Sequence, residues 1–128
     1  MNLLFIFAGG GFGAAVRYIC SQFFNRVGES TYSTGTLFVN TAGALLIGFL
    51  FNTFQSIVVP LELSLFLISG FLGGFTTFST YSLETVRYMQ SGNIKEAIIN
   101  ILLNNILCIV FVLAGMALSK CVLDLHAH

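Results

Sequence analysis

The sequence predicts an all-α membrane protein with four transmembrane helices, of which the third is broken near the middle of the membrane. Of its 128 residues, 56% are hydrophobic and only 8% are charged, and the mean hydropathy is +0.92. Four runs carry no charged side chain, and each can supply the ~20 apolar residues that cross a hydrocarbon core of about 30 Å. We expect one domain, 1–128, without a cleavable signal peptide, with spans at about 3–24, 34–55, 62–88 and 97–120.

The same composition excludes several classes of function. The net charge is zero with the histidines neutral, which gives a nucleic acid nothing to bind. No pairing of a nucleophile with a base is visible, so we expect no enzyme. Four helices enclose little interior, so transport would require an oligomer with its path near the subunit boundary. We interpret the three cysteines, Cys20, Cys108 and Cys121, as small apolar residues.

The first span carries two glycines and an arginine on one helix face, because Gly9, Gly13 and Arg17 are each four residues apart. Small residues at this spacing let another backbone approach closely. An arginine near the end of a span either extends to the headgroups or attracts an anion. The sequence leaves both roles open for Arg17.

In the second span, Asn40 shares a face with Ala44 and Gly48. Inside a membrane its amide must find hydrogen-bond partners, and the small residues beside it allow a neighbouring helix to come close. Asn40 either links two helices or lines a pore as a donor.

The third span is apolar up to Phe71 and then meets a glycine pair, Gly73 and Gly74, followed by Thr76 and Thr77. Glycine lowers helix stability, and threonine is a good N-cap, so we expect the helix to break and restart between residues 73 and 77. Backbone groups freed inside a bilayer need protein, water or an ion as partners. The break is therefore a candidate ion site.

Phe75, Phe78 and Tyr81 recur at spacings of three, which predicts a stripe of rings along the restarted helix. Ring edges in a narrow passage favour an anion and ring faces a cation, whereas a stripe that only packs favours neither. Near the end of this span we expect Glu84 to form an ion pair with Arg87. A turn should follow at 91–93.

The fourth span places Asn100, Asn104 and Cys108 on one face, with Asn105 to the side. The amides can give N–H donors to an anion or bridge helices. Basic residues favour one membrane face only weakly, because the connectors after spans one and three hold three of them and the opposite face holds one, which can permit both orientations. The residues are Arg26, Arg87 and Lys95 against Lys120.

These motifs together resemble those of the small bacterial fluoride channels, the Fluc (CrcB-type) family, over nearly the whole chain. Three motifs occur in the order typical of that family. They are Gly9-x₃-Gly13-x₃-Arg17 in the first span, Gly35-Thr36-Leu37-x-Val39-Asn40-x₂-Gly43 in the second, and Gly70-x₂-Gly73-Gly74-x-Thr76-Thr77-Phe78-Ser79-Thr80 in the third.

The resemblance implies a passive fluoride channel that exports fluoride across the bacterial cytoplasmic (inner) membrane. It implies an antiparallel, dual-topology homodimer in contact with membrane lipid, with two fluoride pores and a structural sodium ion. The sodium ion would rest on the backbone carbonyls of Gly73 and Thr76 from both subunits. An exporter of another small solute and a non-transporting scaffold subunit are the alternatives.

By the same resemblance, Phe78 and Tyr81 would form the aromatic box of the fluoride path and Asn40 a pore-side amide. Thr77 would lie beside the path, Arg17 in an entry vestibule, and Asn104 on a polar track along the fourth span. Two features depart from the family. Tyr81 stands where phenylalanine is usual, and its hydroxyl could bind fluoride or alter the tilt of the ring. The polar track continues only to Cys108 before apolar Val112.

Overall fold

The computed structural model describes residues 2–27 and 33–126, and every regular element in these residues is a helix. Four helical stretches are long and apolar enough to cross a membrane, which confirms the predicted fold class. Residues 28–32, within the connector between the first two spans, lie outside the described residues. The elements are α1 (Asn2–Val27), α2 (Thr34–Ser56), α3 (Leu61–Ser64), η1 (Leu65–Leu72), α4 (Gly73–Phe75), α5 (Phe78–Gln90) and α6 (Ile94–His126).

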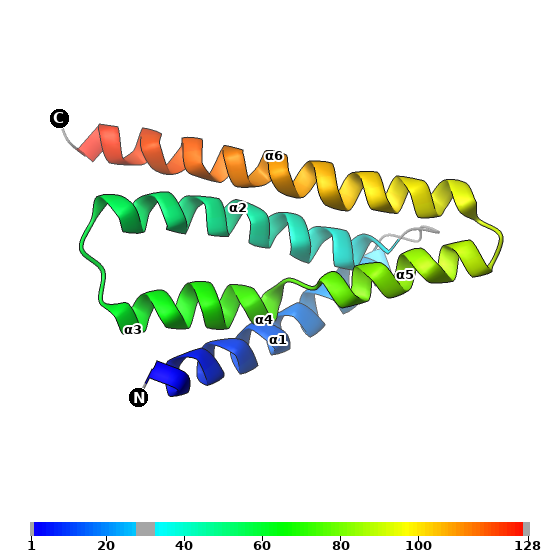
Figure 1. Ribbon diagram of the computed structural model, residues 1–128, viewed down its shortest axis with the longest axis horizontal. Coiled ribbons are helices and arrows are strands. Elements are labelled where there is room, and N and C mark those ends of the chain that lie inside the picture. Colours follow the sequence, from blue (N-terminus) through cyan, green and yellow to red (C-terminus); the bar gives the residue numbers. More distant parts are fainter. Residues whose placement is uncertain (1, 28–32, 127–128) are drawn as a thin grey trace.

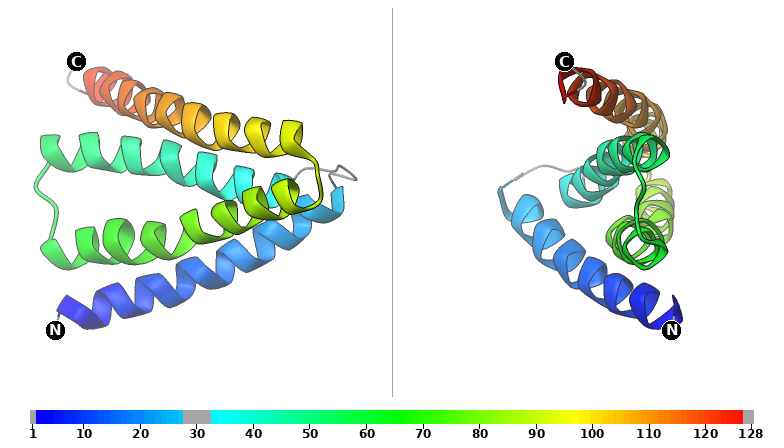
Figure 2. Two further views of the ribbon diagram at one scale, coloured as in Figure 1. Left: turned by 45° about the vertical axis from the view of Figure 1, so that its right-hand side comes forward. Right: turned by 90° about the vertical axis from the view of Figure 1, so that its left-hand side faces the viewer.

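The third span consists of α3, η1, α4 and α5, which follow one another as a single broken rod (Figure 1). Helix α2 runs beside α6, and α1 crosses the rod on the side away from α6. The first turn of α1 and the last turn of α6 lie at the same end of the molecule. Figure 2 shows the helices spread as an open fan, with α1 and α6 outermost.

Glycines let the helix backbones touch, as the sequence predicted for the face of α1. A Cβ at Gly9 would collide with the carbonyl oxygen of Phe66 in η1, and one at Gly13 with the carbonyl oxygen of Phe71. In α2, a Cβ at Gly48 would collide with the carbonyl oxygen of Val112 on α6. These contacts hold the rod against α1, and α6 against α2.

The break lies at Thr76 and Thr77, whose backbones are extended (φ −84°, ψ 159° and φ −151°, ψ 115°). Helix α5 restarts at Phe78, and the Thr77 side chain caps it by accepting a hydrogen bond from the N–H of Thr80 at 3.2 Å. The predicted threonine cap is thus confirmed.

We expected the glycine pair to cause the break, but the two glycines do not break the helix. Gly73 has helical dihedral angles (φ −61°, ψ −36°), and both glycines belong to α4. Gly74 serves packing instead, because a Cβ there would collide with the carbonyl oxygen of Gly10 on α1. Tertiary packing has overridden the low helix propensity of glycine.

The segment η1 is a π-helix, a feature that the sequence did not predict. Its eight residues are apolar apart from Ser69 and Gly70, which suits an α-helix equally well. Its backbone approaches α1 closely at Gly70, where a Cβ would lie 2.8 Å from the carbonyl oxygen of Ile6. Single π turns inside α-helices occur often near functional sites, and η1 ends shortly before the break.

The turn between α5 and α6 occurs where the sequence placed it. Gly92 adopts a left-handed conformation (φ +80°), which side chains rarely tolerate. The N–H of Asn93 then donates to the carbonyl oxygen of Tyr88 at 2.9 Å and closes the end of α5.

Candidate functional site

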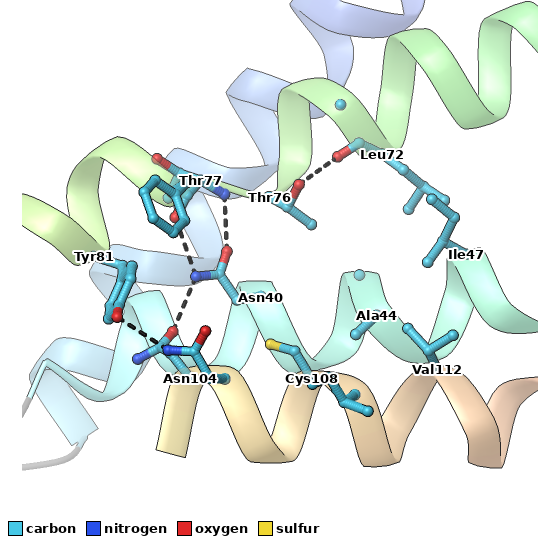
Figure 3. A pocket seen from close by; sticks show the side chains of 15 residues that line it. Asn40, Ala44, Ile47, Leu72, Thr76, Thr77, Tyr81, Asn104, Cys108 and Val112 are labelled. Carbon is cyan, nitrogen blue, oxygen red and sulfur yellow. Dashed lines mark hydrogen bonds between the residues drawn. The ribbon is translucent and has the colours of Figure 1, made fainter. Parts of the chain in front are cut away.

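A cavity of about 410 Å³ lies between α2, α6 and the break in the third span (Figure 3). Its apolar wall includes Ile47, Leu72, Ile109 and Val112. Its polar side chains gather beside the break and come from three helical spans. They are Asn40, Thr76, Thr77, Tyr81, Asn104 and Asn105.

Five of the six predicted pore residues line this cavity, namely Asn40, Thr77, Phe78, Tyr81 and Asn104. Gly73 and Thr76, predicted as the sodium site, line it as well. Arg17, the sixth pore residue, is not among the lining residues. The sequence motifs, far apart along the chain, are therefore brought together around one space.

Asn40 lies on α2 and joins that helix both to the break and to α6. Its Nδ2 donates to the carbonyl oxygen of Thr77 at 3.1 Å and to Oδ1 of Asn104 at 3.0 Å. Its Oδ1 accepts from the N–H of Thr77 at 2.8 Å. Both amide hydrogens are thus committed to protein acceptors, so Asn40 bridges helices in this structure.

A chain of amides continues from Asn40 along α6. Nδ2 of Asn104 donates to Oδ1 of Asn100 at 3.0 Å and to its carbonyl oxygen at 3.2 Å. Nδ2 of Asn100 donates to Oγ1 of Thr85 on α5 at 2.9 Å. Asn100 and Asn104 are buried, and the bonds between them satisfy groups that would be costly to bury alone.

The two rings beside the cavity differ sharply in exposure. Phe78 and Tyr81 meet at a ring-centroid distance of 5.2 Å with an interplanar angle of 67°, an edge-on arrangement. Phe78 is 76% exposed, whereas Tyr81 is 8% exposed. Oη of Tyr81 accepts a hydrogen bond from Nδ2 of Asn105 at 3.1 Å. Sequence reasoning assigned no role to Asn105, and no spacing pattern could have indicated this contact.

Phe75 does not continue this pair of rings, so the predicted stripe of three is wrong. The break falls between Phe75 and Phe78 and interrupts the helical spacing on which the prediction depended. Phe75 is buried and stacks on Phe71, with ring centroids 5.7 Å apart.

Arg17 lies against the break from the side of α1. It is half-buried, and its Nη1 donates to the carbonyl oxygen of Thr76 at 3.2 Å. The guanidinium thus partners one of the carbonyls that the break takes out of the helix.

The carbonyl of Gly73 is freed in a different way. In a continuous helix it would accept from the N–H of Thr77, but that N–H donates to Asn40 instead. A Cβ placed on Gly73 would meet no atom within 4 Å. Neutral carbonyl oxygens are suitable ligands for a small cation, and Gly73 fits that role better than Thr76, whose oxygen already receives Arg17.

Glu84 does not form the predicted ion pair with Arg87. Its Oε1 accepts from the hydroxyl groups of Ser33 and Thr36 at the start of α2, the latter at 2.6 Å. Its Oε2 is buried and has no partner among the described residues. Glu84 therefore turns toward α2, whereas Arg87 is exposed. Local spacing misled us because the partners lie on another helix.

Comparison with known proteins identifies relatives over nearly the whole chain. A family described as "CrcB-like protein, Camphor Resistance (CrcB)" matches residues 4–116. A protein named fluoride-specific ion channel FluC from a Sulfurovum species is 43% identical over 118 residues, 92% of this chain and 93% of the relative.

Two further proteins carry the same name. The one from a Nitratiruptor species is 43% identical over 123 residues, 94% of this chain and 95% of the relative. The one from Ruminiclostridium cellulolyticum is 40% identical over 121 residues, 94% of this chain and 93% of the relative.

Proposed function

The chain belongs to the CrcB-like family of fluoride-specific ion channels, and from that membership we propose a route for the ion through it. The protein is a multi-pass protein of the bacterial inner membrane that conducts fluoride and is not an enzyme. We propose that fluoride passes through the cavity beside Phe78 and Tyr81. The proposal rests on one observation: the break, the edge-on rings and the amide side chains of Asn40 and Asn104 all border the same space.

Fluoride is small and strongly hydrated, so a selective route must replace the water that the ion loses. The edge of an aromatic ring is electropositive and interacts favourably with an anion. Phe78 offers such an edge at the open side of the cavity, and its 76% exposure leaves the ring accessible. A larger halide would fit such a site less well.

We further propose that two copies pair in opposite orientations, with one pore formed beside each copy's cavity. The open space around Gly73 and the exposed ring of Phe78 leave this side of the break free for a partner. The weak asymmetry of basic residues is compatible with both orientations. Chemical labelling of the termini from each side of the membrane should find each terminus on both sides. Labelling from one side only would contradict the paired arrangement.

A sodium ion is proposed at the break, held by the carbonyl oxygens of Gly73 and Thr76 from the two copies. Support comes from the freed carbonyl of Gly73. When bound, the cation would offset the electrostatic cost of an anion in a low-dielectric path. The carbonyl oxygen of Thr76 receives Arg17 on one lone pair and would bind the cation through the other.

Ion release from liposomes that contain the purified protein tests the function directly. We expect rapid fluoride efflux once a potassium ionophore carries the balancing charge, because passive movement of one ion is electrogenic. Chloride should be retained under the same conditions. Folded protein that releases both halides at equal rates, or neither, would contradict fluoride selectivity.

A further inference from the structure

We infer that Tyr81 donates a hydrogen bond from its phenolic O–H to fluoride, and that Asn105 is the positioning residue that directs this donor. The inference deepens the proposed route through the cavity and rests on it. It concerns a hydroxyl that phenylalanine at this position would lack. The inference follows from which hydrogen-bond donors around the cavity are already used within the protein.

Almost every strong side-chain donor that lines the cavity is already committed within the protein. Both amide hydrogens of Asn40 are used, and Nδ2 of Asn104 donates to two oxygens of Asn100. The hydroxyl of Thr76 donates to Leu72, and that of Thr77 to Thr80. Among the described lining residues, the exceptions are the O–H of Tyr81 and the weakly donating thiol of Cys108.

The position of Asn105 determines whether the hydroxyl of Tyr81 donates or accepts in the hydrogen bond between them. Nδ2 of Asn105 lies 2.7 Å from the carbonyl oxygen of Ile101 and 3.1 Å from Oη of Tyr81. The carbonyl oxygen can only accept, so the atom beside it must be the nitrogen and not the amide oxygen. Oη of Tyr81 therefore accepts the second amide hydrogen. Its own hydrogen is left to point away from Asn105.

The chemistry of a phenol suits the ion. A tyrosine O–H is more acidic than an amide N–H or an aliphatic hydroxyl, and bonds to a charged acceptor are the stronger kind. Accepting a hydrogen bond from Asn105 polarises the phenol further. Because Tyr81 is 8% exposed, little water competes for this donor. Fluoride is the most basic halide, so the donor also favours fluoride over chloride.

Near-ultraviolet difference spectroscopy can detect this hydrogen bond, because the chain has four tyrosines and no tryptophan. Sodium fluoride added to the purified wild-type protein should produce a tyrosine difference band, and sodium chloride should not. Tyr81→Phe should abolish the band. The matched control Tyr18→Phe should retain it, because Tyr18 is 66% exposed on α1 and does not line the cavity.

The spectral titration also gives the fluoride dissociation constant. Tyr81→Phe should weaken fluoride binding about tenfold, measured by calorimetry, since one hydrogen bond to a charged partner contributes on that order. An absent wild-type band, or one that persists in Tyr81→Phe, would overturn the inference. If either of these results is found but liposomes with the wild-type protein conduct fluoride, the proposed function still holds. Failure of both conduction and binding would overturn the two together.

A double-mutant cycle tests the positioning role of Asn105. Asn105→Ala should weaken fluoride binding severalfold when Tyr81 is present and change it little in the Tyr81→Phe background. This non-additivity is expected only if Asn105 acts through the hydroxyl. Equal losses in both backgrounds would show that Asn105 merely packs and would overturn the positioning role.

Discussion

Arg17 on the first span donates to the carbonyl oxygen of Thr76 at the break of the third span, 59 residues away along the chain. The same helix face brings Gly13 into backbone contact with Phe71 one turn earlier. The glycine therefore sets the helix separation that lets the guanidinium reach the break. The side chain of Arg17 thus stabilises the extended backbone at the break.

Arg17→Met keeps the aliphatic part of the side chain and removes the donor. We expect the free energy of unfolding to fall by about 1–2 kcal/mol, because the carbonyl of Thr76 loses a charged partner while remaining half-buried. Reversible unfolding in mixed micelles, followed by circular dichroism, measures the change. Arg26→Met is the control, since Arg26 is exposed at the end of α1 and should leave stability unchanged. Equal effects of the two variants would refute the role given to Arg17.

Phe78→Ile should slow fluoride efflux at least about tenfold. Isoleucine occupies similar space without an electropositive ring edge. Stability should change by less than about 1 kcal/mol, because Phe78 is 76% exposed in the single chain. A fluoride electrode in the liposome assay measures the rate. Phe7→Ile provides the control, because Phe7 is 81% exposed on α1. Undiminished efflux through Phe78→Ile would mean that the ring only packs.

Asn40→Ala removes three hydrogen bonds that join α2, the break and α6. We expect the free energy of unfolding to fall by about 2–4 kcal/mol and fluoride efflux to be lost, because Thr77 and Asn104 are left with unpaired groups. Asn52→Ala is the comparison, since it removes a bond to Ser119, away from the cavity. That variant should lose about 1 kcal/mol and conduct normally. Similar stability in the two variants would contradict the bridging role of Asn40.

Gly73 and Gly74 are adjacent, yet alanine should affect them very differently. A Cβ at Gly74 meets the fixed backbone of Gly10, whereas one at Gly73 meets nothing within 4 Å. Gly74→Ala should lower the free energy of unfolding by more than about 2 kcal/mol or prevent folding. Gly73→Ala should keep the helical fold, as judged by circular dichroism. Comparable melting of both variants would show that α1 and α4 can separate at little cost.

Removal of sodium tests the proposed cation site. Protein exchanged into a buffer with a large organic cation should lose fluoride conduction and regain it when sodium returns at the same ionic strength. The expected cause is repulsion between the anion and the freed carbonyl oxygens once the cation is gone. Conduction that continues after elemental analysis shows sodium to be absent would exclude a structural role for the ion.

Much of the fold could be predicted because hydropathy and end-capping act locally. Four charge-free runs determine the number of spans, and a threonine that can cap a helix marks where α5 begins. The glycine faces were also predictable, since helical spacing alone puts Gly9, Gly13 and Arg17 in line. Each of these signals is contained in a short stretch of sequence.

What the sequence could not indicate depends on contacts between distant segments. Gly74 was expected to weaken its helix, and the decisive fact is the carbonyl of Gly10 passing beside it. Glu84 was expected to pair with its neighbour Arg87. It accepts hydrogen bonds instead from two hydroxyl groups, those of Thr36 on α2 and of Ser33 just before α2. For Asn40, the amide is identifiable from sequence, whereas the commitment of both its hydrogens requires knowledge of where Thr77 and Asn104 lie.

The exposed ring of Phe78 has a consequence for the proposed pairing of two copies. If two copies pair as proposed, lipid acyl chains would surround this ring in a single copy and a second copy would replace them. Lipid tails are as apolar as the ring, so burying the ring gains little from solvent exclusion. The proposed pairing would therefore be a competition between protein and lipid for one surface. The mole fraction of protein in the membrane would govern it, and lipids that fit this surface well would shift it toward the single copy.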